Sequence, residues 1–292
     1  MIYAIVGPTC SGKTALANQL SDVLGDAPIV NCDAFQIYKD MDIGTAKLPK
    51  ESKYYSRYHL IDIVEPSNAY SIAEYQKDFR RCMDELLKTN QHIVICGGTG
   101  LYLRSALYDY TFEEGNDDTS DLEELDRETL YKMLLELDHK SAETIHPNNR
   151  KRVIRAISIA RSLSNNKSAN IENQNHEILP QYRNIKIIFV NPDRETLYER
   201  INQRVDLMIK DGLVEEVKTL LDKYQLSVTA KQAIGYKEII DYLDEKLSLD
   251  EAIELIKKRT RNYAKRQVTY FKHQLDTVEL NNVDFKELMK NL

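Results

Sequence analysis

The stretch Gly7-Pro8-Thr9-Cys10-Ser11-Gly12-Lys13-Thr14 fits the pattern G-x-x-x-x-G-K-[ST], and its two flanks decide how the chain folds here. The apolar run Ile2–Val6 before it predicts a buried strand. After it, apolar residues recur on one helical face from Ala15 to Leu24, and Gly25 follows as the expected C-terminal cap. A glycine turn can match the pattern by chance, but a strand before it and a helix after it favour a phosphate-binding loop.

Such a P-loop combines several groups that attract phosphate. Its glycines let successive backbone N–H groups converge on phosphate oxygens, and the N-terminus of the following helix adds positive potential. Lys13 supplies a full charge, and the Thr14 hydroxyl is the expected protein ligand of Mg²⁺, the cofactor that we predict. The motif indicates phosphate binding and leaves the reaction open.

Four apolar runs rich in β-branched residues predict the buried strands of a sheet. They are Ile2–Val6, Ile29–Cys32, Ile93–Cys96 and Ile185–Val190. Longer segments with helical periodicity separate them, and this alternation is typical of a parallel sheet covered by helices. We therefore predict an α/β protein with a P-loop NTPase-like parallel sheet flanked by helices.

The alternation breaks at residues 111–145, where the acidic run Glu113–Asp118 precedes a helical pattern. We interpret this stretch as a small helical insert domain. It would divide the chain into a first part of the core (residues 1–110), the insert, and the rest of the core with C-terminal helices (residues 146–292).

Three further patterns are expected after the insert. The Asn-rich stretch Ser164–Glu177 predicts a mobile surface loop. Ser248-Leu249-Asp250-Glu251 is a capping box and predicts a long helix through Tyr270. A last strand at Thr277–Leu280 and a short helix near Asp284–Lys290 complete the expected order.

The composition, with 42% hydrophobic and 29% charged residues, is that of an ordinary globular protein. The net charge of −6 argues mildly against a nucleic-acid partner, so such a function would depend on local basic patches. No stretch approaches the roughly 18 apolar residues of a membrane span, and the chain opens without a signal-peptide pattern. We expect a cytoplasmic monomer with no membrane contact. Four cysteines lack metal-ligand or disulfide spacing and are interpreted as reduced thiols, mostly in the core: Cys10, Cys32, Cys82 and Cys96.

Asp33 directly follows the predicted strand Ile29–Cys32 and is the strongest candidate for a catalytic group. The carboxyl ends of parallel strands form the edge at which open α/β sheets bind ligands. The other interior run leads into Gly97–Gly100 and carries no carboxylate. A carboxylate at this edge can accept a proton or a hydrogen bond, whereas a turn or helix cap is the alternative role. The spacing alone leaves both roles open.

Segments along nearly the whole chain are similar to one known family. After the P-loop form Gly-Pro-Thr-x-Ser-Gly-Lys-Thr, they are Asn31–Lys47, His59–Ile63, Tyr70–Glu74, Gly97–Tyr102, His146–Asn148, Gln232–Glu238 and Thr260–Gln267. On these residues the chain resembles the tRNA dimethylallyltransferases (isopentenyl-tRNA transferases) in their bacterial form. The resemblance implies transfer of a dimethylallyl group from dimethylallyl diphosphate to N6 of an adenine, with release of pyrophosphate. The implied target is position 37, 3′ of the anticodon, in tRNAs that read codons beginning with U.

The resemblance also implies roles for individual residues. Asp33 corresponds to the general base, Arg204 to an arginine that steadies the leaving pyrophosphate, and Thr14 to a catalytic and Mg²⁺-binding hydroxyl. The residues implied to hold the diphosphate are Gly7, Pro8, Thr9, Cys10, Ser11, Gly12, Lys13 and Thr14. The implied contacts with the tRNA anticodon stem-loop are Asp33, Ala34, Phe35, Gln36, Thr99, Lys151, Arg152, Val153, Ile154, Arg155, Gln232, Ala233, Ile234, Gly235, Tyr236, Lys265, Arg266 and Gln267.

The chain departs from the family pattern at three places. Ala34 stands where the family usually has serine after the catalytic aspartate, so no hydroxyl is expected beside Asp33. Tyr270 stands where the family usually has tryptophan. The stretch between Tyr110 and Leu122 is short for the family.

Two segments without acidic residues agree with an RNA partner. Residues 256–275 contain seven Lys or Arg side chains, and residues 146–161 contain five. In an acidic chain, such segments predict local patches that attract phosphate, although a solvated helix face is the ordinary alternative.

Two other functions share parts of this pattern. A small-molecule kinase of the shikimate or nucleoside-monophosphate type would use the same P-loop sheet with a lid-like insert and would require ATP. A non-catalytic RNA-binding module with a relic P-loop would bind tRNA without turnover. A family relative that prenylates free AMP would not need the basic segments.

Overall fold

The computed structural model describes residues 1–112, 118–162, 177–281 and 285–290. It divides the chain into two compact units. Unit 1 comprises Met1–Leu107 and Pro180–Leu292, and unit 2 comprises Tyr108–Leu179. Residues 113–117 of the acidic run, residues 164–176 of the Asn-rich loop and Asp284 lie outside the described residues.

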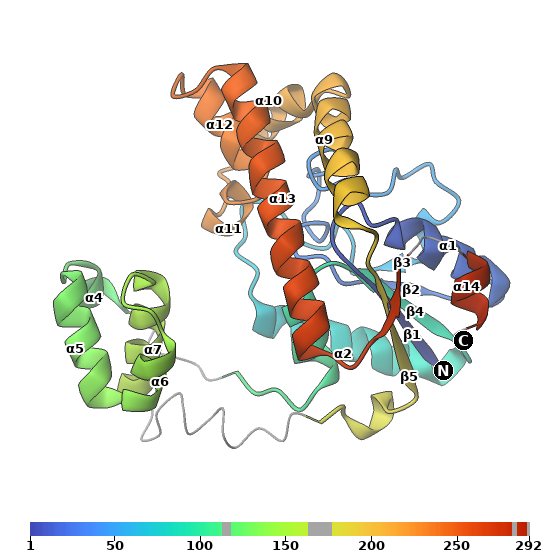
Figure 1. Cartoon of the computed structure of the whole chain (residues 1–292), viewed down its shortest axis with the longest axis horizontal. Coiled ribbons are helices and arrows are strands. Elements are labelled where there is room, and N and C mark those ends of the chain that lie inside the picture. The colour runs from blue at the N-terminus through green and yellow to red at the C-terminus, as the bar shows by residue number, and fades with distance from the viewer. Residues whose placement is uncertain (113–117, 163–176, 282–284, 291–292) are drawn as a thin grey trace. The chain divides into compact units, whose positions relative to one another are not determined.

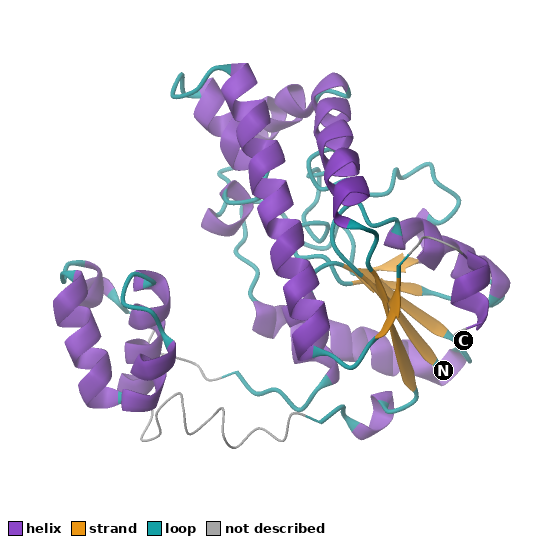
Figure 2. Ribbon diagram, viewed as in Figure 1, coloured by secondary structure: helices purple, strands orange, loops and turns teal. Residues whose placement is uncertain are grey.

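A parallel sheet of six strands forms the centre of unit 1 (Figure 1, Figure 2). The strands are β1 (Ile2–Val6), β2 (Ile29–Asn31), β3 (Tyr58–His59), β4 (Ile93–Gly97), β5 (Ile185–Val190) and β6 (Val278–Leu280), in the order β3-β2-β4-β1-β5-β6. The four strands predicted as buried runs are confirmed, and so is the last strand. The additional edge strand β3 has two residues, too few to show a periodic pattern.

Unit 1 contains nine α-helices among its described residues. They are α1 (Lys13–Val23), α2 (Ile72–Thr89), α3 (Gly100–Leu107), α9 (Arg194–Lys210), α10 (Leu213–Lys223), α11 (Val228–Lys231), α12 (Tyr236–Leu243), α13 (Leu249–Gln274) and α14 (Phe285–Lys290). Some pack on the sheet, and α10, α11 and α12 pack on other helices. The capping box at the start of α13 is confirmed, because Ser248 and Glu251 each accept a hydrogen bond from the other's backbone N–H. The helix runs one turn beyond its predicted end.

Strand alternation sends successive side chains to opposite faces of the sheet, and each face has its own cover. On one face, Ile188 joins a buried cluster with Leu16 of α1 and Leu288 of α14. On the other face, Phe189 packs against Phe271 of α13, with ring centroids 5.5 Å apart. The predicted α/β fold with helices on both faces is therefore confirmed.

Unit 2 is a small helical body with its own apolar core. It contains α4 (Ser120–Glu123), α5 (Arg127–Leu137), α6 (His139–Thr144) and α7 (Arg150–Ser162), which bury one continuous cluster. The unit extends from Tyr108 to Leu179, beyond the predicted insert at residues 111–145, and includes α7, which packs on α5. Among the helices of the described ranges, none is long and apolar enough to cross a membrane.

Candidate active site

The loop between β1 and α1 has the geometry that its glycines require. A side chain on Gly7 would place Cβ 2.5 Å from the carbonyl oxygen of Val190, so only glycine fits against β5 there. Gly12 has φ 90° and is the N-cap residue of α1, a left-handed conformation that glycine adopts without a steric penalty. Lys13 Nζ donates to the carbonyl oxygen of Pro8 at 3.2 Å, which holds its ammonium group over the loop.

The N-terminus of α1 is suited to an anion. Its N-cap residue offers no side-chain acceptor, and its first turn contains no acidic residue. The first N–H groups of the helix therefore point to the loop, and no side chain of the helix neutralises the positive end of its dipole. Thr14 lies in this first turn and is exposed, as the predicted phosphate and metal role requires.

Asp33 follows β2 at the carboxyl edge of the sheet and caps the next turn. Its Oδ1 accepts hydrogen bonds from the backbone N–H groups of Phe35 at 3.0 Å and Gln36 at 3.4 Å. Among the residues that the structure describes, no donor bonds to Oδ2. Both roles that the spacing left open are therefore possible at once: one oxygen orients the carboxylate, and the other can accept a proton.

Thr99 fixes the backbone beside Asp33. Its backbone N–H donates to the carbonyl oxygen of Cys32 at 3.1 Å, and its Oγ1 accepts from the N–H of Ala34 at 3.1 Å. The turn after β4 and the turn after β2 are thereby joined at the edge of the sheet, on both sides of the Asp33 backbone. Burial raises the pKa of Cys32 to about 12 and that of Cys96 to about 11, so these thiols stay protonated, in keeping with core cysteines.

A cavity of about 270 Å³ in unit 1 brings the predicted groups together. From the P-loop it is lined by Thr9 and Cys10, from the turn after β2 by Asp33 and Phe35, and from α9 by Arg204. Further predicted residues on its wall are Gln232, Ala233, Ile234, Gly235 and Arg266. Its apolar lining includes Ile201, Val205, Met208 and Ile256. One surface thus combines a phosphate loop, a carboxylate, two cations and an apolar wall.

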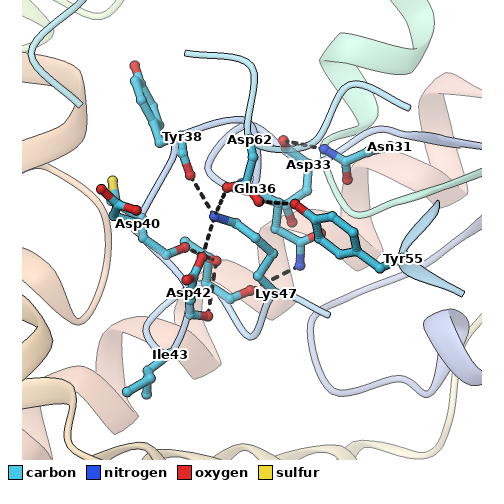
Figure 3. Close-up of polar contacts among 12 residues, drawn as sticks. Asn31, Asp33, Gln36, Tyr38, Asp40, Asp42, Ile43, Lys47, Tyr55 and Asp62 are labelled. Carbon is cyan, nitrogen blue, oxygen red and sulfur yellow. Dashed lines mark hydrogen bonds and ion pairs between the residues drawn. The ribbon is translucent and has the colours of Figure 1, made fainter. Parts of the chain in front are cut away.

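A buried lysine supports the wall formed by residues 44–46. Lys47 Nζ donates to the carbonyl oxygen of Tyr38 at 2.6 Å, to Asp42 Oδ1 at 2.6 Å and to Asp62 Oδ1 at 2.5 Å. Figure 3 shows the ammonium group at the centre of these three acceptors. Tyr55 donates a hydrogen bond to the second oxygen of Asp62. The buried charge is therefore neutralised on two sides, and the loop from Tyr38 to Asp62 closes around it.

Glu216 also supports the wall formed by residues 44–46. Its carboxylate accepts from the backbone N–H groups of Asp42, Ile43 and Gly44 at 2.7–3.2 Å. It also accepts from the Tyr236 hydroxyl at 2.6 Å. This carboxylate joins residues 42–44 to Tyr236, and the adjoining residues 44–46 and 232–235 line the cavity.

Several residues with an implied RNA contact are buried. Val153 and Ile154 belong to the core of unit 2, Tyr236 is 0% exposed, and Gln267 is 5% exposed. Their side chains are not available to RNA, so the direct contacts predicted for them do not agree with the structure. Periodicity explains the two apolar cases, because both lie on the inward face of α7. The outward face of α7 carries the exposed Lys151, Arg152 and Arg155, in agreement with an RNA-facing role.

The basic segments are also less uniform than their sequences indicate. Three basic residues of α13 form ion pairs. Lys257 pairs with Asp206 and Glu254, Arg259 pairs with Glu238, and Lys272 pairs with Glu279. Arg150 of unit 2 donates to the carbonyl oxygens of Leu122, Glu123 and Leu125. Lys265 and Arg266 are exposed and form no ion pair within the described part of the chain. The patch on α13 that can attract phosphate therefore includes these two neighbouring cations and the exposed Lys258.

The comparisons with known proteins agree with this arrangement. A family model described as IPP transferase matches residues 36–274. The chain belongs to the IPP transferase family. This membership confirms the family predicted from the sequence and the prediction of a transferase, and it sets aside the kinase and the non-catalytic module.

Similar proteins of the IPP transferase family match over almost their whole length. The tRNA dimethylallyltransferase of an Exiguobacterium species is 42% identical over 300 residues, covering 100% of this chain and 94% of that protein. That of Bacillus subtilis is 43% identical over 281 residues, covering 94% of this chain and 88% of that protein.

Solved structures from the same family share the fold. The tRNA delta(2)-isopentenylpyrophosphate transferase of Staphylococcus epidermidis aligns with a TM-score of 0.70 at 35% identity, covering 99% of this chain and 96% of that one. A eukaryotic dimethylallyltransferase acting on tRNA aligns with a TM-score of 0.84 at 26% identity, covering 99% of this chain and 76% of that one.

Proposed function

We propose that this chain is a tRNA dimethylallyltransferase that prenylates N6 of the adenine at position 37, in tRNAs that read codons beginning with U. The donor is dimethylallyl diphosphate and the acceptor region is the anticodon stem-loop. The observation that carries the proposal is the cavity that joins Asp33, Arg204 and the P-loop to an apolar wall. One chain supplies all these groups, and we propose a monomer as the active form.

The cavity suits an allylic diphosphate. The P-loop N–H groups and Lys13 would bind the diphosphate, and Ile201, Val205 and Met208 offer an apolar surface to the five-carbon group. The allylic C–O bond breaks readily when its leaving group is stabilised, so positioning and charge neutralisation carry most of the catalysis. Arg204, exposed on α9 and free of ion pairs within the described residues, is placed to neutralise the departing pyrophosphate.

Asp33 supplies the acceptor for the proton that the amine loses. The N6 lone pair forms the bond to the first carbon of the dimethylallyl group, and the electrons of the broken C–O bond leave with pyrophosphate. The proton on N6 passes to Asp33, whose Oδ1 is already held by two backbone N–H groups. An anticodon-loop adenine is unpaired, so moving it into a pocket costs less than flipping a base out of a duplex.

The residues at the P-loop also fit Mg²⁺. Within the described residues, no group of three or more His, Cys, Asp or Glu side chains is arranged to hold a metal ion. This agrees with an ion held mainly by phosphate oxygens, as Mg²⁺ commonly is, with the exposed Thr14 hydroxyl as the protein ligand. When bound, Mg²⁺ supplies positive charge for the diphosphate.

The proposal is tested by one reaction mixture. Purified protein, Mg²⁺, unmodified tRNA and dimethylallyl diphosphate should give an adenosine heavier by one five-carbon unit, detected by mass spectrometry of digested tRNA. Chelation of Mg²⁺ should stop the reaction, and ATP should be neither required nor hydrolysed. Unmodified adenosine beside ATP-dependent phosphorylation of a metabolite would refute the proposal.

Replacing Asp33 by alanine tests the proton acceptor separately. We expect kcat to fall by about 10²–10⁴-fold, the usual effect of removing a positioned general base, with the Kd for tRNA nearly unchanged. Single-turnover rates within about threefold of those of the wild-type protein would assign Asp33 to the turn cap alone.

A further inference from the structure

Gln267 is a buried polar side chain in the C-terminal half of the basic helix α13. It is 5% exposed and lies between Ala264 and Phe271 on the helix face that packs against the sheet. Its neighbours Lys265 and Arg266 are exposed on other faces. A buried primary amide needs partners for both its donor and its acceptor, so its hydrogen bonds are informative.

Both ends of this amide bond to the catalytic edge of the sheet. Gln267 Oε1 accepts from the backbone N–H of Thr9 at 3.0 Å, and its Nε2 donates to the carbonyl oxygen of Gly98 at 2.8 Å. One side chain thus bridges the P-loop after β1 and the turn after β4, two neighbouring strands. The assignment of oxygen and nitrogen follows from these partners, because an N–H and a carbonyl oxygen demand opposite ends of the amide.

The turn after β4 leaves space for this bridge. A Cβ atom on Gly98 would overlap Gln267 Nε2, and a Cβ atom on Gly100 would overlap the Tyr270 ring. The two glycines therefore let α13 approach the turn closely through side chains one turn apart. Thr99, between them, bonds to Ala34 and Cys32 on either side of Asp33. A continuous set of contacts leads from α13 to the P-loop and to Asp33.

We propose that Gln267 is a positioning residue that fixes the P-loop for the diphosphate from within the RNA-facing helix, and not an RNA contact. This inference rests on the proposed function, which supplies the diphosphate ligand. Thr9 lines the cavity, and its N–H direction is set by Gln267. Misplacing such a loop lowers diphosphate binding and catalysis, whereas the exposed cations of α13 are left in place.

The test uses Gln267→Met, which keeps the volume but removes both hydrogen bonds, and inorganic pyrophosphate as the probe. We expect the Kd for pyrophosphate, measured by calorimetry with Mg²⁺, to rise about tenfold, and the KM for dimethylallyl diphosphate to rise in parallel. The Kd for tRNA should change by less than about twofold. Gln267→Glu keeps the acceptor for Thr9 but turns a carboxylate oxygen toward Gly98, and it should weaken pyrophosphate binding as well. It also serves if the methionine variant does not fold.

Lys265→Ala is the matched control on the same helix and should show the opposite pattern. We expect it to weaken tRNA binding and leave pyrophosphate binding unchanged. If the Gln267 variants weaken tRNA binding and keep the pyrophosphate Kd, Gln267 is an RNA contact and the proposal is overturned. Unchanged Kd values for both ligands would overturn it as well. Failure of the wild-type protein to bind pyrophosphate would instead refute the proposed function.

Discussion

Replacing Lys47 by methionine should strongly destabilise unit 1, because it leaves carboxylates without their counter-charge. The Lys47 side chain is 1% exposed, and its partners Asp62 and Asp42 are 12% and 46% exposed. Breaking a buried ion pair costs about 3–5 kcal/mol, and the half-exposed Asp42 can turn to water, so we expect a loss of about 3 kcal/mol. With about 2–4 °C for each kcal/mol in a protein of this size, Tm should fall by about 6–12 °C.

The assay is urea unfolding followed by circular dichroism, and Lys50→Met is the control, since Lys50 is exposed on the same segment. Asp62→Asn removes the carboxylate that Lys47→Met leaves unpaired, so the double variant should recover at least about 1 kcal/mol relative to additivity. A change below about 1 kcal/mol for Lys47→Met, or strictly additive effects, would refute this account. Because Thr45 and Ala46 line the cavity, the KM for dimethylallyl diphosphate should rise in the same variant.

Three other changes test separate parts of the structure. Replacing both Lys265 and Arg266 by alanine should weaken tRNA binding and reduce its salt slope by about one unit for each phosphate that is no longer neutralised, measured by filter binding; an unchanged slope would mark a merely solvated face. Ala34→Ser should alter turnover by less than about tenfold, because Ala34 contacts Thr99 through its backbone N–H; a collapse of activity in a steady-state assay would show a differently built pocket. Arg150→Ala should lower the stability of unit 2 by about 1–3 kcal/mol without changing the salt slope, since its guanidinium binds three carbonyl oxygens; thermal unfolding beside filter binding separates these outcomes.

The parts of the fold that depend on local pattern were predictable. The runs Ile2–Val6 and Ile185–Val190 have the bounds of the observed strands, because a strand buried on both faces is almost continuously apolar; Lys186 is the one charged residue in these runs and lies at the half-buried start of β5. The two-residue strand β3 has no such pattern. The predicted end of the insert at residue 145 differs from the end of unit 2 at Leu179 for a different reason. The apolar stripe of α7 shows that one face is buried, but periodicity does not indicate whether that face packs on a sheet or on α5.

The residues of the candidate site also fall into two groups, those that a local sequence pattern predicts and those that it does not. The P-loop could be predicted because its geometry depends on glycines that are adjacent in sequence. The roles of Arg204 and residues 232–236 came from the family resemblance, since no local pattern brings α9 and the start of α12 to one cavity. Family membership supports the family as a whole. It does not separate a residue that touches RNA from one that supports the site beneath it.

The burial of a polar side chain distinguishes a residue that supports the site from one that touches RNA. Such burial can be predicted in part from the sequence. Gln267 lies on the apolar stripe of α13, three residues after Ala264 and four before Phe271, where a solvated face would not be expected. Glu238 lies on the buried face of α12 and pairs there with the Gly235 N–H and Arg259. A polar residue in an apolar stripe must find partners inside the protein, because burial without a hydrogen bond costs about 1–3 kcal/mol. A polar residue at such a position is therefore predicted to join two chain segments by hydrogen bonds inside the protein. In this chain Gln267 links α13, which carries the exposed Lys265 and Arg266, to the loop that would hold the diphosphate.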